Sequence, residues 1–306
     1  MPLQPLLREV SRSFYLSIRL LPDELRGSVG LAYLLARATD TIADTAAALP
    51  DERRRLLTAV GDAIAAGWST AEVDLQAFIA SQGNDAERSL MERLDELLAA
   101  LLQQDAADQA DIRTVLGHIV RGQLLDIDRP TLPDAKALDE YTYLVAGSVG
   151  EFWTDICARH VPQFATLPMQ DMRALGRSFG CGLQLVNILR DAGEDRRMGR
   201  CYLPGDEVAH WGVEAVWMQW QAKAAKAMFD GIIYAQAVNP PRIRAAVALP
   251  ALIGRSTLNR LRRAGPRALH KRVKVPRAEV HWLLLRMALG RASIKTLRRE
   301  WENRAR

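Results

Sequence analysis

The sequence contains few cysteines, and no pattern suggests that they are paired. Cys157, Cys181 and Cys201 are the three cysteines in 306 residues. Their irregular spacing provides neither a disulfide framework nor a CxxC pair for a metal ion. Because this usage is typical of a reducing compartment, we expect a cytoplasmic protein. The five histidines are also widely spaced, which gives no zinc-ligand pattern.

Long apolar runs and the common nucleotide-binding motifs are also missing. No stretch of about 18 residues is apolar enough for a membrane-spanning helix. The opening residues MPLQPLLREVSRSF lack the basic and apolar regions of a signal peptide. Gly180 and Gly182 form a GxG, but no third glycine completes a dinucleotide fingerprint. Walker A and HExxH motifs do not occur, so the sequence signatures of P-loop enzymes and zinc proteases are absent.

Strand-like alternation is scarce, whereas helical periodicity extends over most of the chain. Leucine and alanine recur at three- and four-residue intervals in residues 52–67, 86–104 and 275–290, each of which we predict to be a helix. The turn-forming clusters between such segments are LPDE at 49–52, SQGND at 81–85, DRPTLPD at 128–134, RHVPQFATLP at 159–168, LPGDE at 203–207 and AVNPP at 237–241. We therefore predict an all-α protein. Because no linker-like tract interrupts it, we predict a single domain over residues 1–306.

Acidic residues are scarce toward the C-terminus. From Arg255 to Arg306 there are sixteen Lys or Arg and three acids, a net charge of +13, whereas the preceding residues carry −8. A basic region binds nucleic acid, anionic lipid or an acidic substrate, or it is a solvated helical surface. A run of acids earlier in the chain is interpreted as a solvated helix face without a role. These are Glu92, Asp95, Glu96, Asp105, Asp108 and Asp111.

The segment AYLLARATDTIADT, residues 32–45, carries two aspartates four residues apart. Asp40 and Asp44 share one helical stripe with Tyr33 and Arg37. Taken alone, such a pair is common and is typical of a solvated helix face. Here the surroundings are rich in Leu and Ala, which indicates a helix that faces the core. Carboxylates near the core need partners.

A second pair, Asp191 and Asp195, lies in FGCGLQLVNILRDAGED. With Gln184 and Asn187 it forms a polar stripe on an otherwise apolar helix. An internal polar network without a ligand is the simpler explanation, but the recurrence of the pattern argues against it. If the two pairs meet across a cavity, four carboxylates face one another, and cations must separate them.

The proposed ligands of both pairs are oxygen atoms, with no convergent His or Cys. Mg²⁺ or Mn²⁺ is therefore the expected ion, and zinc is not. Mg²⁺ usually takes one or two carboxylates and shares phosphate oxygens with its substrate. The two Asp pairs thus predict a diphosphate held through metal.

Arginines accompany both Asp pairs. They are Arg12, Arg19, Arg37, Arg190, Arg196, Arg197 and Arg200. Guanidinium groups bind phosphate oxygens in a bidentate manner, which suits a diphosphate substrate. Surface ion pairing is the competing explanation, and we expect it to hold for one or two of them.

Residues 141–150, YTYLVAGSVG, combine tyrosines with Gly147 and Gly150. Inside a helix each glycine costs about 0.8–1 kcal/mol relative to alanine. Close packing between helices is the favoured explanation, and the alternative is space for a long apolar ligand, or for helix bending, beside Tyr141 and Tyr143. In the second case Tyr141 offers a hydroxyl for proton transfer or a ring face for a carbocation.

Four motifs together resemble the squalene/phytoene synthase family in order and separation. They are SRSF at 11–14, AYLLARATDTIAD at 32–44, YTYLVAGSVG at 141–150 and QLVNILRDAGED…RCYLP at 184–204. The resemblance covers roughly residues 8–290. It implies a single-domain isoprenoid-synthase helical bundle with a central cavity. It also implies a prenyltransferase that condenses two prenyl diphosphates head to head.

The resemblance also implies roles for individual residues. Asp40, Asp44, Asp191 and Asp195 match the two aspartate-rich motifs that hold Mg²⁺ and diphosphate. Tyr141 matches a tyrosine implicated in proton handling during the first half-reaction. The remaining substrate-binding matches are Ser11, Arg12, Ser13 and Phe14 near a diphosphate, Tyr33, Arg37, Gln184 and Asn187 around the metals, and Arg190 and Tyr202 at the phosphate-binding rim.

Within the family, Asp40–Thr41 and YLVAGSVGEFW are more similar to squalene synthases, whereas RCYLP is more similar to the carotenoid-forming branch. Ala43 and Thr45 stand where many relatives carry further acids. The resemblance therefore implies a squalene synthase, which converts two farnesyl diphosphates to presqualene diphosphate and then to squalene with NADPH. The alternative within the family is a phytoene or dehydrosqualene synthase.

The non-enzyme alternative is a basic helical protein that binds lipid or nucleic acid. The enzyme hypothesis needs no nucleic-acid partner. It does involve hydrophobic substrates and products, so we expect peripheral contact with the inner face of the membrane through the basic C-terminal region and Trp282. The sequence predicts no oligomeric state.

Overall fold

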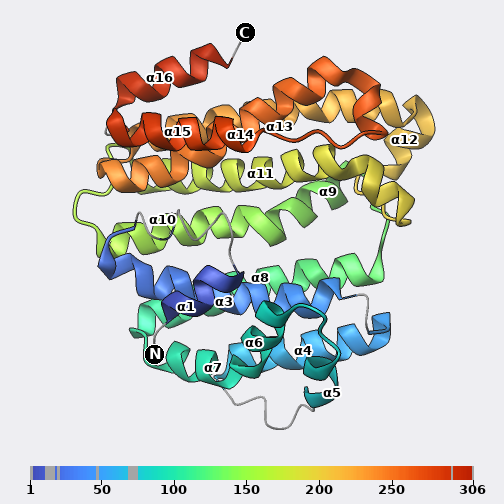
Figure 1. Cartoon of the computed structure of the whole chain (residues 1–306), viewed down its shortest axis with the longest axis vertical. Helices are drawn as coiled ribbons and strands as arrows, with labels where there is room; N and C mark the ends of the chain where they lie inside the picture. The colour runs from blue at the N-terminus through green and yellow to red at the C-terminus, as the bar shows by residue number, and fades with distance from the viewer. Residues whose placement is uncertain are drawn as a thin grey trace. The chain divides into compact units, whose positions relative to one another are not determined.

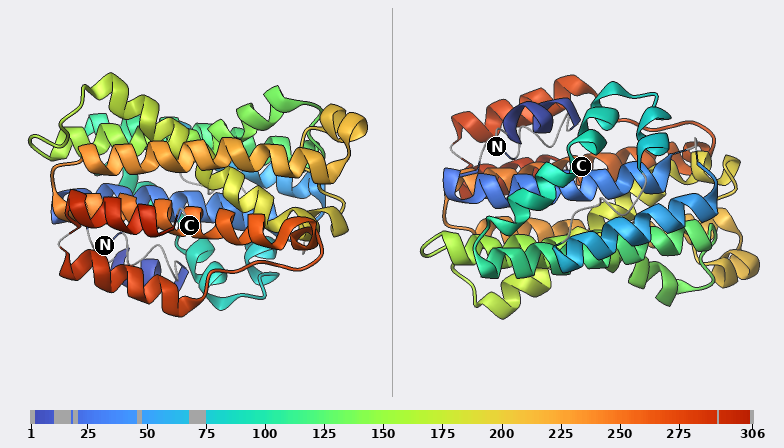
Figure 2. Two further views of the ribbon diagram at one scale, coloured as in Figure 1. Left: turned by 90° about the horizontal axis from the view of Figure 1, so that it is seen from above. Right: turned by 90° about the horizontal axis from the view of Figure 1, so that it is seen from below.

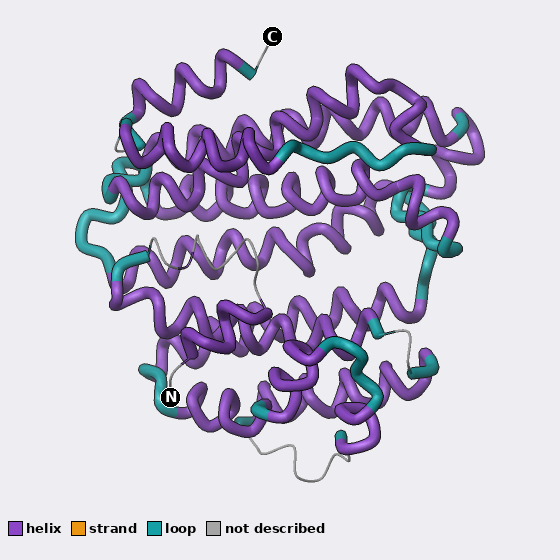
Figure 3. Tube along the Cα trace, viewed as in Figure 1, coloured by secondary structure: helices purple, strands orange, loops and turns teal. Residues whose placement is uncertain are grey.

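The computed structural model describes residues 3–10, 18, 21–45, 48–67, 75–290 and 292–304. These residues form helices joined by turns, with two isolated β-bridges and no strand among them (Figure 3). The predicted all-α class is confirmed. Contacts between Cα atoms group the chain into two compact units, residues 1–128 and 129–306. Each unit is described by itself, and the single-domain assignment stays a prediction.

Unit 1 is built around the long helix α3. Its described helices are α1 (Leu3–Val10), α3 (Asp23–Asp44), α4 (Pro50–Ala66), α5 (Gln76–Ala80), α6 (Asp85–Glu92), α7 (Leu94–Leu102) and α8 (Ala106–Asp128) (Figure 1). Helices α4, α6, α7 and α8 all contact α3. Leu31, Leu35 and Ile42 of α3 are fully buried because they recur at helical intervals on its inner face. The core of unit 1 therefore fixes the helix that carries the first Asp pair.

Unit 2 is built around α11, a helix of 29 residues. Its described helices are α9 (Ala135–Thr142), the π-helix η2 (Tyr143–Gly147), α10 (Ser148–His160), α11 (Met169–Arg197), α12 (Gly205–Trp211), α13 (Val213–Ala237), α14 (Pro241–Ala264), the 3₁₀-helix η3 (Gly265–Leu269), α15 (Arg277–Leu289) and α16 (Ile294–Asn303). Helices α10, α13 and α14 lie alongside α11 (Figure 1 and Figure 2). The second Asp pair is thus carried by the most extensively packed helix of unit 2.

Two of the three predicted helices are confirmed. Helix α4 matches the prediction over 52–67 and ends at Gly67, whose φ of 74° is readily adopted by glycine. Helix α15 matches the prediction over 275–290. The prediction of one helix over 86–104 is wrong, because the chain breaks at Arg93 into α6 and α7. Nothing in the described contacts explains this break.

The glycines in and around residues 141–150 allow two backbones to pack closely. A Cβ atom on Gly150 would lie 2.0 Å from the carbonyl oxygen of Gly176, and one on Gly180 would lie 2.2 Å from that of Ala146. Helices α10 and η2 therefore contact α11 with no space for a side chain at these points. The interpretation of these glycines as a close-packing device is confirmed.

Asp108 corrects the prediction that the acids between 92 and 111 form a solvated face. Its side chain is only 2% exposed. The hydroxyl of Ser28 on α3 donates to Asp108 at 2.7 Å. The helical pattern could not reveal this partner, which lies 80 residues away in the sequence.

The described helices contain none that is both long and apolar enough to cross a membrane. Cys157, Cys181 and Cys201 are all free thiols. Burial raises the pKa of the Cys157 thiol far above its usual range, so this cysteine stays protonated.

Candidate functional site

The first Asp pair lies at the C-terminal end of α3. Asp44 is exposed, and the Asp40 side chain keeps 43% of its surface accessible. Arg37, one turn earlier, extends between Asp40 and Glu87 of α6. Its Nη1 lies 3.8 Å from Oδ2 of Asp40, and its Nη2 lies 2.5 Å from Oε1 of Glu87. Tyr33, Arg37, Asp40 and Asp44 follow one face of α3, as their spacing predicts.

Gln123 of α8 is a partner of Asp40 that the sequence analysis missed. Its Nε2 donates to Oδ1 of Asp40 at 2.6 Å. Its Oε1 is buried and has no hydrogen-bond partner among the described residues. A buried carbonyl oxygen without a donor is costly, so this side chain leaves an acceptor available beside the carboxylate. No sequence signal distinguishes Gln123 from the other glutamines.

The surroundings of Asp40 disfavour the ionised form of its carboxyl group. Desolvation by the surrounding protein, followed by the nearby Asp44 carboxylate, raises the pKa of Asp40 from 3.8 to about 6. Arg37 and the hydrogen bond from Gln123 offset only part of this shift. A divalent cation bound at Asp40 and Asp44 would offset the repulsion between these two carboxylates.

The second Asp pair lies near the C-terminal end of α11. Asp191 accepts hydrogen bonds from Arg190, with 3.0 Å between Nε and Oδ1. This hydrogen bond is the main reason that the pKa of Arg190 is raised. Earlier on the same helix, Asn187 donates to Gln184 across 3.5 Å. Gln184, Asn187, Asp191 and Asp195 thus lie along α11 at the spacing that the sequence predicts.

Arg272 is a further partner of Asp191, and it comes from the basic C-terminal region. Its Nε lies 3.4 Å from Oδ1 of Asp191, and its Nη1 lies 3.5 Å from Oε2 of Glu194. The chain reaches this position because Gly193 lets η3 pack directly on α11. A Cβ atom on Gly193 would lie 1.9 Å from the carbonyl oxygen of Leu269. Within a uniformly basic segment, the sequence could not single out Arg272.

Tyr141 and Tyr202 stack on each other in unit 2. Their ring centroids are 5.1 Å apart and the planes are inclined by 26°. Tyr141 is buried, and Tyr202 follows Cys201, whose backbone is held by two hydrogen bonds to residues 130–132. The structure therefore brings together two tyrosines that the resemblance selected from separate motifs.

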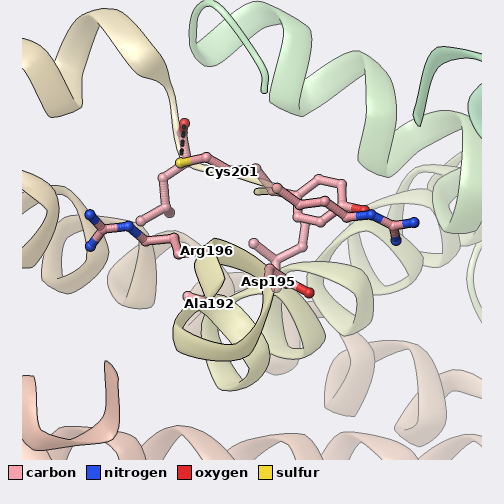
Figure 4. A pocket seen from close by; sticks show the side chains of 8 residues that line it. Ala192, Asp195, Arg196 and Cys201 are labelled. Carbon is pink, nitrogen blue, oxygen red and sulfur yellow. Dashed lines mark hydrogen bonds between the residues drawn. The ribbon is translucent and has the colours of Figure 1, made fainter. Parts of the chain in front are cut away.

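A small pocket beside α11 contains the second Asp of the pair (Figure 4). Its lining residues are Ile188, Ala192, Asp195, Arg196, Arg200, Cys201, Tyr202 and Leu203. The backbone amide of Arg200 donates to the carbonyl oxygen of Asp195 at 2.8 Å, which closes the turn after α11. The lining thus includes one carboxylate, two arginines and a tyrosine, and the Arg196 side chain extends away from the Asp195 carboxylate (Figure 4).

The predicted site residues fall into two groups within the described part of the chain. Unit 1 contributes Tyr33, Arg37, Asp40 and Asp44, and unit 2 contributes Tyr141, Gln184, Asn187, Arg190, Asp191, Asp195 and Tyr202. Ser11, Arg12, Ser13 and Phe14 lie outside the described residues. In the described ranges no three His, Cys, Asp or Glu side chains form a protein-only metal site. An Asp pair completed by a diphosphate still fits Mg²⁺, which needs only one or two carboxylates.

The sequence also matches those of known proteins. A sequence model of the squalene/phytoene synthase family matches residues 7–279. The presqualene diphosphate synthase of Zymomonas mobilis is 28% identical over 293 residues, which cover 90% of this chain and 89% of that protein. Phytoene synthase 1 of Arabidopsis thaliana is 29% identical over 72% of this chain, and the match spans half of that protein.

The fold is also found among solved structures. The complex of TcSQS with the ligand E5700 superposes with a TM-score of 0.78. The match covers 99% of this chain and 90% of that structure at 22% identity. At this identity the likeness establishes the fold alone.

Proposed function

Because the chain belongs to the squalene/phytoene synthase family of prenyltransferases, we propose that it condenses two farnesyl diphosphates head to head with Mg²⁺. The first product is presqualene diphosphate, which NADPH then reduces to squalene. The observation that carries this proposal is the recurrence of one motif in both units. An Asp pair near the end of a long helix is accompanied in each by an arginine salt-bridged to it, Arg37 at Asp40 and Arg190 at Asp191.

The Asp pairs are the proposed metal ligands. Asp40 with Asp44, and Asp191 with Asp195, would each hold Mg²⁺ against a diphosphate. The raised pKa of Asp40 and the orphaned Oε1 of Gln123 support this assignment, because both are relieved by a cation. When bound, Mg²⁺ stabilises the negative charge that develops on the departing diphosphate.

The arginines would bind the same phosphate groups from the protein side. Arg190 and Arg272 already lie against Asp191, so their guanidinium groups can pass from this carboxylate to phosphate oxygens. Arg37 is oriented by Glu87 in the same way near Asp40. Departure of diphosphate from one farnesyl group leaves an allylic cation, which the double bond of the second substrate attacks.

Tyr141 would act on the carbon skeleton. Its ring is buried and stacked on Tyr202, so the two aromatic faces can stabilise a passing carbocation. The cyclopropane of presqualene diphosphate closes when the adjacent carbon loses a proton, and the Tyr141 hydroxyl is the proposed group for this transfer. A buried position also keeps water from trapping the cation as an alcohol.

The sequence contains no dinucleotide-binding fingerprint for NADPH. Cationic side chains that could bind its phosphates line a second pocket beside α11. Its lining includes the cations Arg190, Arg197, Lys271 and Arg272. Because Arg190 and Arg272 are assigned to the diphosphate, we propose Arg197 and Lys271 for the phosphates of NADPH. Departure of the second diphosphate would leave a cation that rearranges, and NADPH, when bound, would supply the hydride that converts it to squalene.

A second candidate stops at the first product. The Zymomonas mobilis relative, matched over nine-tenths of both chains, is a presqualene diphosphate synthase. In that case this chain would release presqualene diphosphate and leave the reduction to another enzyme. A phytoene or dehydrosqualene synthase is the third candidate, supported by the match to a plant phytoene synthase.

A product assay tests these candidates. Purified protein is incubated with farnesyl diphosphate and Mg²⁺, with and without NADPH, and the extracts are analysed by mass spectrometry. Squalene only with NADPH, and presqualene diphosphate without it, is the expected result. Presqualene diphosphate under both conditions would assign the second candidate, and dehydrosqualene, or phytoene from geranylgeranyl diphosphate, would assign the third. Condensation of neither substrate would overturn the proposal.

Asp variants connect the activity to the site. We expect Asp40→Asn and Asp191→Asn each to lower kcat by about 10²- to 10³-fold, because metal ions contribute several kcal/mol to such transition states. Asp62→Asn on α4 and Asp171→Asn on α11 replace exposed aspartates outside the site and serve as controls. Equal rates for site and control variants would show that the Asp pairs do not hold the metal.

A further inference from the structure

Helix α15 exposes an apolar stripe. Trp282 is 45% exposed, Leu285 is 54% exposed and Leu289 is 73% exposed. Their spacing of three and four residues places them on one helix face. Leu283 and Met287 of the same helix are buried against unit 2. Single exposed leucines are ordinary, but a contiguous apolar stripe on an otherwise anchored helix indicates a surface that is covered in use.

Trp282 is held in place by a buried charge network. Glu300 of α16 is fully buried and binds Arg286 at 3.1 Å and Arg304 at 2.9 Å. The guanidinium groups of these two arginines lie 5.5 Å and 5.7 Å from the centre of the Trp282 ring. The indole is therefore oriented by cation–π contacts before any partner arrives.

The exposed charged side chains on α15, on α16 and in the segment before α15 are mostly basic. Helix α16 contacts α15, and both form the edge of unit 2 at which the chain ends (Figure 1). Among the described residues from 271 to 304, the exposed charged side chains are Lys271, Arg272, Lys274, Arg277, Lys295, Arg298, Arg299 and Glu302. Seven are cationic and one is acidic, so the exposed charges of this part of the chain are predominantly positive. Lys271 and Arg272 lie at the pocket beside α11, and the other five cations remain for the surface of α15, of α16 and of the segment just before α15.

We propose that α15 and the exposed side of α16 form a membrane-docking face for anionic lipid bilayers. The face consists of Trp282, Leu285, Leu289 and Ile294 with the rim Arg277, Lys295, Arg298 and Arg299. Helix α15 lies in the plane of the interface, its leucines enter the acyl boundary, and the rim binds lipid phosphates. Tryptophan prefers this interfacial depth because its ring is apolar and its N–H is polar.

Charge complementarity selects this occupant over two others. A second copy of the same face would bring like charges together, which is unfavourable. Nucleic acid would satisfy the cations but would leave the leucine stripe exposed to water. An anionic bilayer satisfies both the apolar and the cationic groups. The inference stands on these contacts and does not depend on the proposed reaction.

Flotation with lipid vesicles tests the membrane-docking face. The full chain is mixed with phosphatidylcholine vesicles, with or without phosphatidylglycerol, and the bound fraction is measured. We expect binding to the anionic vesicles at low salt, weakened by high salt because the attraction is partly electrostatic. Leu285→Gln with Leu289→Gln should weaken the partition coefficient by about tenfold or more. The matched control, Leu49→Gln with Leu102→Gln, replaces two exposed leucines of unit 1 and should leave binding unchanged.

A second variant separates the cationic contribution. Lys295→Gln, Arg298→Gln and Arg299→Gln together should remove the preference for anionic over neutral vesicles while leaving thermal unfolding unchanged. Wild-type protein that does not bind anionic vesicles at low salt would overturn the proposal, as would equal binding by the leucine variant. A dimer in light scattering that the leucine variant abolishes, without vesicle binding, would assign the face to a second copy and overturn it too.

Discussion

The side chain of Gln123 on α8 donates a hydrogen bond of 2.6 Å to Asp40 on α3, while its own carbonyl oxygen is buried without a partner among the residues that the structure describes. This one-sided arrangement fixes the orientation of a proposed metal-binding carboxylate and leaves an acceptor beside it. Replacing a side chain that orients a metal ligand typically lowers metal affinity or activity by about 10- to 100-fold. Gln123 is therefore a positioning residue for the proposed reaction.

Replacing Gln123 should weaken the metal site without abolishing the fold. Gln123→Met keeps the volume but removes both the donor to Asp40 and the orphaned acceptor. We expect the Mg²⁺ concentration for half-maximal activity to rise by about 10- to 100-fold. The control is Gln109→Met on the same helix, whose side-chain amide donates to backbone carbonyl oxygens. This variant should leave the Mg²⁺ requirement unchanged. A merely structural role for Gln123 would lower thermal stability in both metal-free and metal-saturated protein and would not move the Mg²⁺ requirement.

The raised pKa of Asp40 should make the metal-free protein more stable toward acidic pH. Its folded-state pKa of about 6 exceeds the ordinary value of 3.8, so the folded state binds this proton more tightly than the unfolded state does. The ionised Asp40 carboxylate therefore destabilises the folded state above pH 6. This destabilisation disappears as the pH falls from 6 toward 3.8 and the carboxylate is protonated. In thermal unfolding with EDTA, Asp40→Asn should melt higher than wild type at neutral pH, and the gap should narrow as the pH falls through this interval. A gap that is independent of pH would contradict the assignment.

Arg272 should compete with metal for Asp191. Because its guanidinium group lies 3.4 Å from this carboxylate, Mg²⁺ must displace or share it. Arg272→Gln should therefore lower the Mg²⁺ concentration for half-maximal activity by a few-fold, as expected for a partly exposed ion pair of about 1 kcal/mol. The KM for the diphosphate substrate should rise, because a phosphate-binding group is lost. Titration of activity with Mg²⁺ and with substrate separates the two effects, and Arg298→Gln is the control. If neither the Mg²⁺ concentration for half-maximal activity nor the KM changes, Arg272 binds neither the metal-binding carboxylate nor the substrate during the reaction.

The close packing of α10 on α11 should make Gly150 intolerant of a side chain. Gly150→Ala places a methyl group 2.0 Å from the carbonyl oxygen of Gly176, so the backbones must separate. We expect a loss of stability of about 1–3 kcal/mol or more, as for other overpacked sites. Gly117→Ala on α8 is the matched control, because its added methyl group would have no neighbour within 4 Å. This second variant should gain up to about 1 kcal/mol from helix propensity. Urea unfolding measures the free energy of unfolding of both variants.

The local character of the protein could be predicted from the sequence. The helical periodicity predicted α4 and α15, and the spacing of the Asp pairs placed each on one helix face, because both features depend on residues a few positions apart. The break at Arg93 and the burial of Asp108 could not be predicted. The partner of Asp108 is Ser28, a residue 80 positions away on another helix.

The sequence by itself determined the all-α class, the spacing of the two Asp pairs and their oxygen ligand atoms, since these follow from periodicity and residue type. Tertiary structure alone decided which distant side chains complete the site. Gln123 reaches Asp40, Arg272 reaches Asp191, and Tyr141 stacks on Tyr202 because helix packing within each unit joins segments far apart in the chain. Tertiary structure also decided which face of α15 is exposed: Trp282 and Leu285 face outward, while Leu283 faces inward. The physical reason is that a residue's partners depend on the direction in which its helix packs, and local sequence does not specify that direction.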